Sequence, residues 1–582
     1  MRKTKIICTI GPASEDHAIM SQLVAKGMNV ARLNFSHGEH AEHQSRIETV
    51  RRVATQLDVP LAIMLDTKGP EIRTGSLQNK KVNLKAGQKF VLTTREVPGD
   101  EYEVGISYHN LPAEVKPGIS ILLADGLINL EVESITATDI ICRVVNGGEL
   151  GEKKGVNVPA VRINLPFLSD KDIADINFGI DEKVDFIAAS FVRSAQDVLD
   201  IRRILESRDA NIDIIAKIES QAGVDNLDEI IKVADGVMVA RGDLGVEIPA
   251  EEVPLVQKRI IQECNKAGKV VIIATQMLDS MINNPRPTRA EVSDVANAIF
   301  DGADAIMLSG ESAAGRYPVE AVETMARVAA RAEQALPYHD LLRSKRLQGT
   351  SSVTDAISFA TCTTVASLGI NTIVTSTTTG ATARMVSKYR PRADIFAVTA
   401  NPAVMRKLVM VWGVYPVLTR PAYGTDDILE AALDRCLEKQ YIRQGDMVVL
   451  TAGSPAGLTG STNLIKVHVV SDILLRGMGV GSKPASGRSK IVLDETDLAR
   501  IESGDILVCR AVYPAMVPYL NKVTAIVAEE GGLTSDAAII GLNTGLPVIV
   551  GAQDATRILK EGDLVTIDTA HGLIYSGLAK VL

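Results

Sequence analysis

The chain has 582 residues, 46% of them hydrophobic, which is enough for roughly four domains with sizeable cores. Its net charge of −9 argues against a nucleic-acid-binding protein, because affinity for polyphosphate backbones comes largely from basic residues. The six cysteines show no C-x-x-C spacing, which argues against a disulfide scaffold and a zinc site and suits a reducing compartment. With no export signal and no run of 18 apolar residues, we expect a cytoplasmic protein without membrane contact.

A repeating unit begins at residue 5, in which a short apolar run ends in a polar residue and a helix-like stretch follows. Alternating strands and helices indicate parallel pairing, and eight such strands close a (β/α)₈ barrel. The predicted strands are Lys5–Ile10, Val30–Ser36, Ala62–Asp66, Phe186–Ser190, Ile214–Glu219, Gly236–Arg241, Val270–Thr275 and Ala305–Ser309. We assign residues 1–69 and 167–343 to this barrel.

Two neighbouring strands of the predicted barrel end in charged residues that share a face. Lys217 and Glu219 are two apart, as are Arg241 and Asp243. Two carboxylates and an ammonium suit a divalent cation beside a phosphate group. The alternative for either stretch alone is a pair of surface ion pairs. Since all the strands end on one rim, convergence of polar residues there favours a functional site.

The third unit is interrupted by about 95 residues of alternating polar and apolar sequence that contain the hairpin-turn signal Asp125-Gly126. We predict an inserted antiparallel β domain over residues 70–166, placed to act as a lid that excludes water. Arg73 and Lys154 lie near the two ends of this insertion. Solvated surface charge is the alternative for each.

A second α/β region follows, which we assign to residues 344–474 and predict to be a doubly wound sheet. After its first predicted strand, the hydroxyl-rich stretch Ser376–Thr382 opens a helix. Such a helix start can bind an anion, and the alternative is a capping loop. Residues 475–489 are rich in glycine and serine and are predicted to form a flexible linker. Residues 490–582 then form a further domain.

Seven stretches, in this order along the chain, resemble the motifs of the pyruvate kinase family. They are Thr4–Ser14, Ala31–Gly38, Leu65–Gly75, Ile215–Glu219, Ala240–Gly245, Ala274–Met277 and Met307–Ser312. The resemblance covers residues 1–472 and implies transfer of the phosphoryl group of phosphoenolpyruvate to ADP, which gives pyruvate and ATP. A catalytically inactive relative that senses phosphoenolpyruvate is the alternative, and retention of the charged motif residues argues against it.

The resemblance implies roles for individual residues at the rim. Lys217 and Arg32 would contact the phosphoryl group, and Thr275 would lie beside the route of the proton to the enolate. Glu219 and Asp243 would hold Mg²⁺ (or Mn²⁺), and the backbone of Gly242 and Asp243 would receive the substrate carboxylate.

The remaining implied contacts concern potassium, nucleotide and effector. The implied K⁺ ligands are Asn34, Ser36, Asp66 and Thr67, and the implied nucleotide contacts are Asn34, Arg73 and Lys154. Ser376, Thr377, Thr378 and Thr379 match the loop that would bind a phosphorylated effector. A homotetramer is the family expectation. Glu71 matches a position at which a glutamate implies dependence on K⁺.

The last domain carries a second resemblance. Glu530–Ala538, followed by Gly545–Gly551, is similar to the swivelling phosphohistidine domain of phosphoenolpyruvate-utilising enzymes. Asp536 stands where those enzymes have the phosphorylated histidine. Without that carrier, the domain is expected to be structural or regulatory, and a phosphoenolpyruvate synthase is disfavoured.

Overall fold

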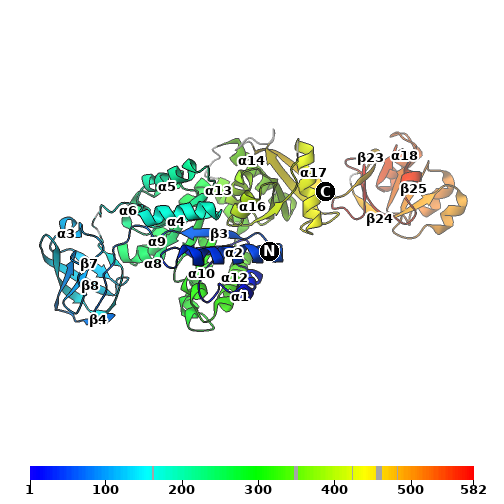
Figure 1. Ribbon diagram of the computed structural model, residues 1–582. Helices are drawn as coiled ribbons and strands as arrows, with labels where there is room; N and C mark the ends of the chain where they lie inside the picture. Colours follow the sequence, from blue (N-terminus) through cyan, green and yellow to red (C-terminus); the bar gives the residue numbers. More distant parts are fainter. Residues whose placement is uncertain are drawn as a thin grey trace. The chain divides into compact units, whose positions relative to one another are not determined.

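The structure is a computed structural model, and it describes residues 1–159, 161, 163–346, 352–422, 424–453, 462–481 and 483–581 (Figure 1). Two compact units can be distinguished. The first comprises Met1–Leu341, Ala383–Arg390 and Asn401–Pro416, and the second comprises Leu342–Thr382, Pro391–Ala400 and Val417–Leu582. Among the described residues, no helix combines the length and the apolar character needed to cross a bilayer.

Eight parallel strands close a barrel in the order β1-β16-β15-β14-β13-β12-β3-β2, which confirms the predicted fold. The strands are β1 (Lys5–Thr9), β2 (Val30–Asn34), β3 (Ala62–Asp66), β12 (Phe186–Ala189), β13 (Asp213–Ile218), β14 (Gly236–Ala240), β15 (Val270–Ala274) and β16 (Ala305–Leu308). Each is an apolar run that ends where polar residues begin, as expected for strands buried on both faces.

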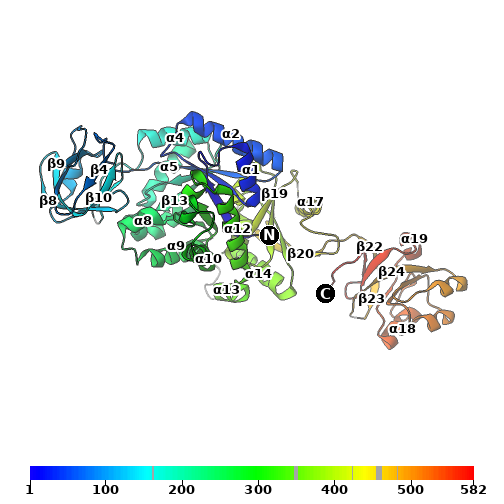
Figure 2. The same ribbon diagram turned by 90° about the horizontal axis from the view of Figure 1, so that it is seen from below.

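Helices surround these strands (Figure 2). They are α1 (His17–Lys26), α2 (His40–Leu57), α4 (Asp170–Asp181), α5 (Ala195–Ser207), α6 (Gln221–Asp225), α7 (Leu227–Val233), α8 (Arg241–Glu247), α9 (Val253–Ala267), η1 (Asp279–Ile282), α10 (Arg289–Asp301), α11 (Gly310–Ala313) and α12 (Pro318–Gln334). The next helix, α13 (Tyr338–Arg346), contains the boundary between the two units.

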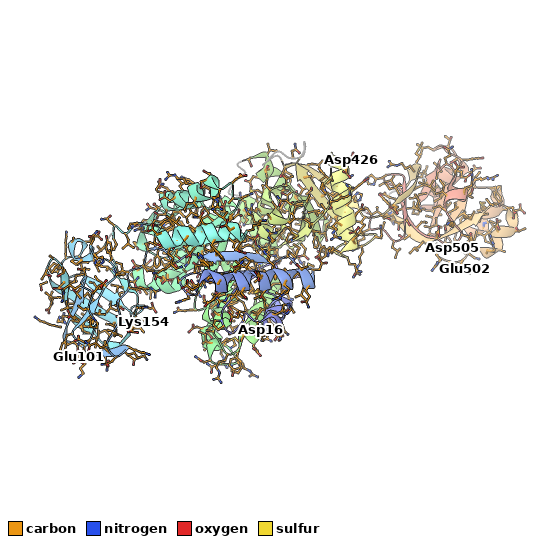
Figure 3. The ribbon with its side chains drawn as sticks, in the orientation of Figure 1. Asp16, Glu101, Lys154, Asp426, Glu502 and Asp505 are labelled. Carbon is orange, nitrogen blue, oxygen red and sulfur yellow. The ribbon has the colours of Figure 1, made fainter. Side chains whose placement is uncertain are left out.

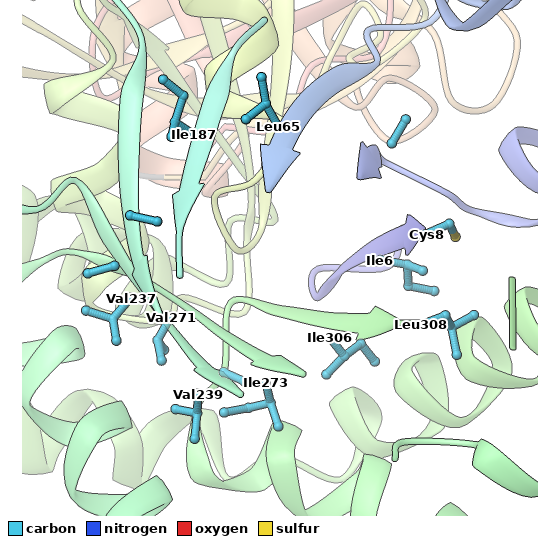
Figure 4. Close-up of a cluster of buried hydrophobic side chains, with 14 of the residues drawn as sticks. Ile6, Cys8, Leu65, Ile187, Val237, Val239, Val271, Ile273, Ile306 and Leu308 are labelled. Carbon is cyan, nitrogen blue, oxygen red and sulfur yellow. The ribbon is translucent and has the colours of Figure 1, made fainter. Parts of the chain in front are cut away.

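The main core lies between the strands and the helices, and Figure 4 shows part of it. On β13, Ile214, Ala216 and Ile218 belong to this core. Because side chains alternate along a strand, Lys217 between them faces the barrel interior. The same alternation turns Arg32 of β2 inward, between the core residues Ala31 and Leu33.

The inserted β domain has its own apolar core and two sheets, one six-stranded in the order β11-β7-β8-β9-β5-β6 and one pairing β10 with β4. Its pairs are antiparallel except for β5 and β6, which run parallel. The elements are β4 (Lys81–Leu84), β5 (Lys89–Thr93), β6 (Glu103–Gly105), α3 (Leu111–Glu114), β7 (Ser120–Leu123), β8 (Ile128–Ile135), β9 (Asp139–Asn146), β10 (Gly148–Gly151) and β11 (Val156–Asn157).

The second α/β region contains a five-stranded sheet in the order β19-β18-β17-β20-β21, of which the last strand is antiparallel to β20. Its elements are α14 (Val353–Leu368), β17 (Thr372–Ser376), α15 (Ala381–Lys388), β18 (Asp394–Thr399), α16 (Pro402–Leu408), β19 (Val414–Leu418), α17 (Thr425–Glu438), β20 (Met447–Gly453) and β21 (Thr462–Val469).

Parts of this region belong to the barrel unit. Residues 383–390 and 401–416 cluster with the barrel, although the whole of 344–474 was predicted as a separate domain. Buried ion pairs explain the difference: Arg390 contacts Asp304 at 2.8 Å, and Lys407 contacts Asp213 at 2.6 Å. Both carboxylates lie at the amino-terminal ends of barrel strands, opposite the rim that carries the polar motif residues.

The C-terminal part folds around an eight-stranded sheet in the order β22-β29-β28-β24-β25-β26-β27-β23. Its elements are β22 (Ile473–Arg476), β23 (Met478–Val480), β24 (Ala485–Val492), η2 (Glu495–Arg500), β25 (Ile506–Cys509), η3 (Pro514–Tyr519), β26 (Ala525–Ala528), α18 (Asp536–Thr544), β27 (Val548–Val550), α19 (Ala555–Ile558), β28 (Leu564–Asp568) and β29 (Leu573–Ser576).

The prediction of a flexible linker over residues 475–489 is wrong. Most of these residues lie in β22, β23 and β24, and β24 is an interior strand that pairs with both β25 and β28. The glycines permit close approach of backbones: a side chain at Gly479 would collide with the carbonyl oxygen of Thr569, only 1.8 Å from an added Cβ. The glycine-rich composition, which is also typical of linkers, therefore allows the strands to pack closely here.

Candidate functional site

Asp66, at the end of β3, is the centre of a buried charge cluster on the barrel rim. Its carboxylate accepts hydrogen bonds from Arg32 Nε at 2.6 Å and from Lys217 Nζ at 3.0 Å. Burial alone would raise the pKa of Asp66, but the two cations outweigh it and hold the pKa below its usual value. Asp66 is therefore an anion that fixes two cations in place.

Lys217 is buried, and its ammonium contacts three polar side chains, of which Asp66 is one. Its ammonium also donates to Ser190 Oγ at 2.7 Å and lies 3.1 Å from Glu219 Oε1. Burial alone would lower the pKa of Lys217, but Asp66 and Glu219 raise it above the ordinary value. The ammonium stays charged and is held where it can meet a second anion.

Glu219 and Asp243 form the acidic side of the cluster. Burial raises the pKa of Glu219 to about 7, and its Oε2 accepts a 2.6 Å hydrogen bond from the Phe191 amide. Burial likewise raises the pKa of Asp243, with repulsion from Glu71 and Asp125 adding to it.

Two carboxylates that are costly to ionise together suit a divalent cation. The described residues contain no group of three or more histidine, cysteine or acidic side chains arranged around one metal. Mg²⁺ commonly takes one or two carboxylates and fills its other positions with water and substrate phosphates. The donor set of Glu219 and Asp243 fits such an ion.

Thr275 follows β15 in a strained backbone conformation. Its φ is +67°, rare for a β-branched residue, and Gln276 beside it has a φ of +53°. The Thr275 Oγ1 accepts a 2.7 Å hydrogen bond from the amide of Gly242, near the start of α8. Arg241 donates to the Thr275 carbonyl at 2.7 Å and pairs with Asp294. The structure thus brings Thr275 and Gly242 together.

The implied potassium ligands come from two adjacent strand ends. Asn34 and Asp66 are direct neighbours in the β2–β3 register, and the Asn34 side chain accepts from the amide of Ser36 at 3.1 Å. Thr67 Oγ1 accepts from the amide of Ser190 at 3.2 Å. All four residues supply oxygen atoms, as a monovalent ion requires, but the charge of Asp66 is already shared between two cations.

Arg73 and Lys154 lie on adjacent segments of the inserted domain. Arg73 forms a β-bridge with Gly155, and the Thr74 amide donates to the Lys154 carbonyl at 2.8 Å, while the Lys154 amide donates to Thr74 Oγ1 at 2.9 Å. Arg73 Nε is 2.6 Å from Glu71 Oε2, whereas the Lys154 side chain is exposed; Lys154 is labelled in Figure 3. Within the described part of the chain, neither cation contacts the rim cluster, so their role stays a prediction.

The loop from Ser376 to Thr379 connects β17 to α15. Thr377 Oγ1 accepts a 2.9 Å hydrogen bond from the amide of Gly380, whose φ is +87°. Thr378 and Thr379 are exposed. Thr377 thus caps the turn, beside two exposed threonines.

Two rim residues were not recognised as site residues from the sequence. Ser190 links Lys217 and Asp66, since its Oγ also lies 3.1 Å from Asp66 Oδ1. Phe191 supplies its amide to Glu219 from a left-handed conformation with a φ of +54°. The sequence feature that could have identified Ser190 is its position directly after a strand, where polar residues reach the rim.

Comparison with known proteins identifies the family. Residues 1–322 match the model of the pyruvate kinase barrel domain, residues 355–468 match the pyruvate kinase alpha/beta domain, and residues 501–572 match the mobile domain of PEP-utilising enzymes. The last match confirms the predicted resemblance of the C-terminal domain.

Full-length relatives agree with these domain matches. The chain is 54% identical over 586 residues to the pyruvate kinase of Geobacillus stearothermophilus and 53% identical to that of Bacillus licheniformis, with 100% of each chain covered. A pyruvate kinase crystal structure from Cryptosporidium parvum superposes with a TM-score of 0.76 at 41% identity, covering 80% of this chain and 96% of that one. The chain belongs to the pyruvate kinase family, in the bacterial form that carries an additional C-terminal domain.

Proposed function

We propose that this chain transfers the phosphoryl group of phosphoenolpyruvate to ADP, with Lys217 and Arg32 as the cations that meet the transferring group. The observation that supports this proposal most strongly is the buried cluster in which Asp66 binds Arg32 Nε at 2.6 Å and Lys217 Nζ at 3.0 Å. Phosphoryl transfer needs positioning and neutralisation of charge rather than covalent help from the protein. Cations held in advance supply both.

Members of this family are generally metal-dependent. Glu219 and Asp243 would hold the ion, which we propose to be Mg²⁺ or Mn²⁺. When bound, such an ion neutralises charge on phosphoryl oxygens. The raised pKa of Glu219, about 7, supports the assignment because a cation would favour its ionised form.

The substrate carboxylate is assigned to the backbone amides of Gly242 and Asp243. The Gly242 amide currently donates to Thr275 Oγ1, so substrate binding would release that hydroxyl. The Thr275 hydroxyl also donates to the Ala274 carbonyl at 2.6 Å, so its oxygen would then accept a hydrogen bond from the proton donor, or from a water, at the carbon of the enolate. The strain at Thr275 supports this role, since strained residues cluster at functional sites.

A potassium ion is assigned to the oxygen atoms of Asn34, Ser36, Asp66 and Thr67. It would offset part of the charge that phosphoenolpyruvate and ADP bring into one pocket. Arg73 and Lys154 are assigned to the phosphates of the nucleotide, together with Asn34. Their domain would then cover the rim as a lid during transfer.

Regulation is assigned to the loop of Ser376, Thr377, Thr378 and Thr379. Its exposed hydroxyls and the helix start at Ala381 support binding of the phosphate of a small effector. Activation would act through a homotetramer with two states of different effector affinity. The net charge of −9 disfavours nucleic acid as a partner, and we expect the enzyme to act in the cytoplasm.

A coupled assay tests the proposed reaction. Pyruvate formed from phosphoenolpyruvate is reduced by lactate dehydrogenase, and NADH consumption is followed with and without ADP. Pyruvate should appear only when ADP, a divalent cation and K⁺ are all present. Absence of ADP-dependent pyruvate formation from a folded protein would favour the inactive sensing relative.

A further inference from the structure

A pocket lies at the end of the barrel opposite the active-site rim, within the barrel unit. It is a small recess that is partly open to solvent. The walls come from the starts of β15 and β16, from the end of α9 and from α15 and its C-terminal extension. None of the lining residues belongs to the rim cluster or to the loop Ser376–Thr379.

The pocket is rich in cations. Four basic side chains line it against a single carboxylate, that of Asp304; the four are Lys269, Arg384, Lys388 and Arg390. Asp304 is already engaged, because its two oxygens accept hydrogen bonds from Arg390 at 2.8 Å and from the Val271 amide at 3.0 Å. The nearby carboxylate of Asp213 is likewise shared between Arg384 and Lys407.

Arg390 retains an unused donor. Its side chain is only 6% exposed, and its Nε has no hydrogen-bond partner. Leaving such a donor buried and unpaired is costly, so a bound acceptor would stabilise it.

Lys269 shows the local excess of positive charge. Its Nζ donates to the Ala234 carbonyl at 2.7 Å, which is a neutral partner. Burial lowers its pKa, and repulsion from Arg384 and Arg202 adds to this, while Asp235 and Asp213 oppose it. The pocket therefore holds more cationic charge than its own carboxylates balance.

We propose that this pocket binds a phosphate dianion, either as inorganic phosphate or as the phosphate group of a small ester. Guanidinium and ammonium groups converging from two elements form strong, charge-assisted hydrogen bonds to such an anion. The ligand would bridge the barrel to α15, whose first residue follows the hydroxyl-rich loop almost directly. This site is separate from the proposed effector loop and does not depend on the proposed reaction.

The single tryptophan of the chain reports on this pocket. Trp412 is 2% exposed, and the Arg390 guanidinium lies over its ring at 4.9 Å. Ser387, which lines the pocket, donates to the Trp412 carbonyl at 2.6 Å. A ligand that contacts Arg390 should therefore change the intrinsic fluorescence.

The test is a fluorescence titration of the full-length protein with potassium phosphate against potassium chloride at equal ionic strength. A saturable change with phosphate alone is expected. A parallel titration with glycerol 3-phosphate distinguishes the two ligands. If glycerol 3-phosphate binds more tightly than inorganic phosphate, the pocket binds a phosphate ester; if it binds more weakly, the pocket binds the free ion. The double variant Ser376→Glu/Thr379→Glu should retain the response, because its effector loop is not part of the pocket.

The variant Lys269→Met/Lys388→Gln should weaken phosphate binding at least about tenfold, since two charge-assisted contacts are lost. Lys266→Gln is the control, because Lys266 is exposed on α9 and pairs with Glu263. If circular dichroism shows that the double variant is misfolded, Lys388→Gln alone takes its place. No saturable response, an equal response to chloride, unchanged affinity in the folded lysine variant, or loss of the response in the loop variant would overturn the proposal.

Discussion

At the scale of single residues, the proposed active site depends on one carboxylate, Asp66, that binds two cations. Asp66 is buried and keeps its charge because Arg32 and Lys217 are within hydrogen-bond distance. From the sequence, the resemblance to pyruvate kinases implied roles for all three, and the structure shows that alternation of side chains along β2, β3 and β13 turns them inward. Ser190 could not be assigned in this way, because a serine that ends a strand is also a common solvent-facing residue.

Ser190→Ala should lower kcat about tenfold, because a hydrogen bond to a charged group typically contributes about 1.5 kcal/mol. The Ser190 hydroxyl accepts from Lys217 and donates to Asp66, so we propose that Ser190 is a positioning residue that orients Lys217. KM for ADP should change little, and Ser190→Thr should restore part of the rate. Ser207→Ala, at an exposed hydroxyl that donates to Ile204, is the control. An unchanged kcat would remove Ser190 from the site.

Glu71→Lys should remove most of the dependence on K⁺. An ammonium at this position would supply the positive charge that K⁺ otherwise brings. Activity is measured with K⁺ and with tetramethylammonium in its place. Glu71→Gln is the matched control, because it also loses the 2.6 Å pair with Arg73 but adds no cation. Equal K⁺ dependence in wild type and the lysine variant would show that Glu71 is an ordinary hinge residue.

At the scale of elements, the strands were predictable because each barrel strand is an apolar run ended by a polar residue or glycine. Ala62–Asp66 was predicted with the bounds that the structure shows. β22, β23 and β24 were missed, because glycine and serine are as common in linkers as in strands whose backbones approach closely. Local composition does not distinguish the two cases.

The start of α10 offers a test of an element boundary. Glu291 accepts hydrogen bonds from the Ser280 amide at 2.7 Å and from the Thr288 amide at 2.7 Å, so it joins η1 to the helix. Glu291→Ala should destabilise the barrel by about 1–2 kcal/mol, which lowers the apparent Tm by several degrees. Glu320→Ala, exposed in the first turn of α12, should have almost no effect.

The same contact predicts a pH dependence. Burial alone would raise the pKa of Glu291, but the hydrogen bonds from Ser280 and Thr288 lower it below the ordinary value. Its stabilisation is therefore complete above the unfolded pKa and is lost as the pH falls through the lower, folded pKa. The Tm difference between wild type and Glu291→Ala should narrow under acid conditions and stay constant near neutral pH. A difference independent of acid would contradict the assignment.

At the scale of the whole molecule, the C-terminal domain begins earlier in the chain than its sequence suggested. The sequence showed its family resemblance and the replacement of histidine by Asp536, which begins α18. It did not show that the sheet begins at Ile473, before the predicted linker. The start of the sheet is determined by pairing between strands that are far apart in the sequence, and a local sequence pattern carries no information about such pairing.

Truncated chains test whether the C-terminal domain begins at β22 or only after the predicted linker. A chain that ends at Val470 removes the complete eight-stranded sheet and should remain active in the coupled assay. A chain that ends at Val492 keeps β24 without its partners β25 and β28, and its unpaired strand edges should cause aggregation. Size-exclusion chromatography measures the difference. A monodisperse chain ending at Val492 would support a linker there after all.

The central claim, that the tethered ammonium of Lys217 acts on the transferring phosphoryl group, is tested most directly by Lys217→Met. Pyruvate formation and Mn²⁺ binding, the latter by electron paramagnetic resonance, are measured on the same preparation. Because the cation acts most strongly in the transition state, kcat should fall at least about 10²-fold. Mn²⁺ affinity should stay close to that of the wild type, because Glu219 and Asp243 are retained. A variant that kept more than about a tenth of the wild-type kcat, well above that expected remainder, would contradict the role assigned to Lys217.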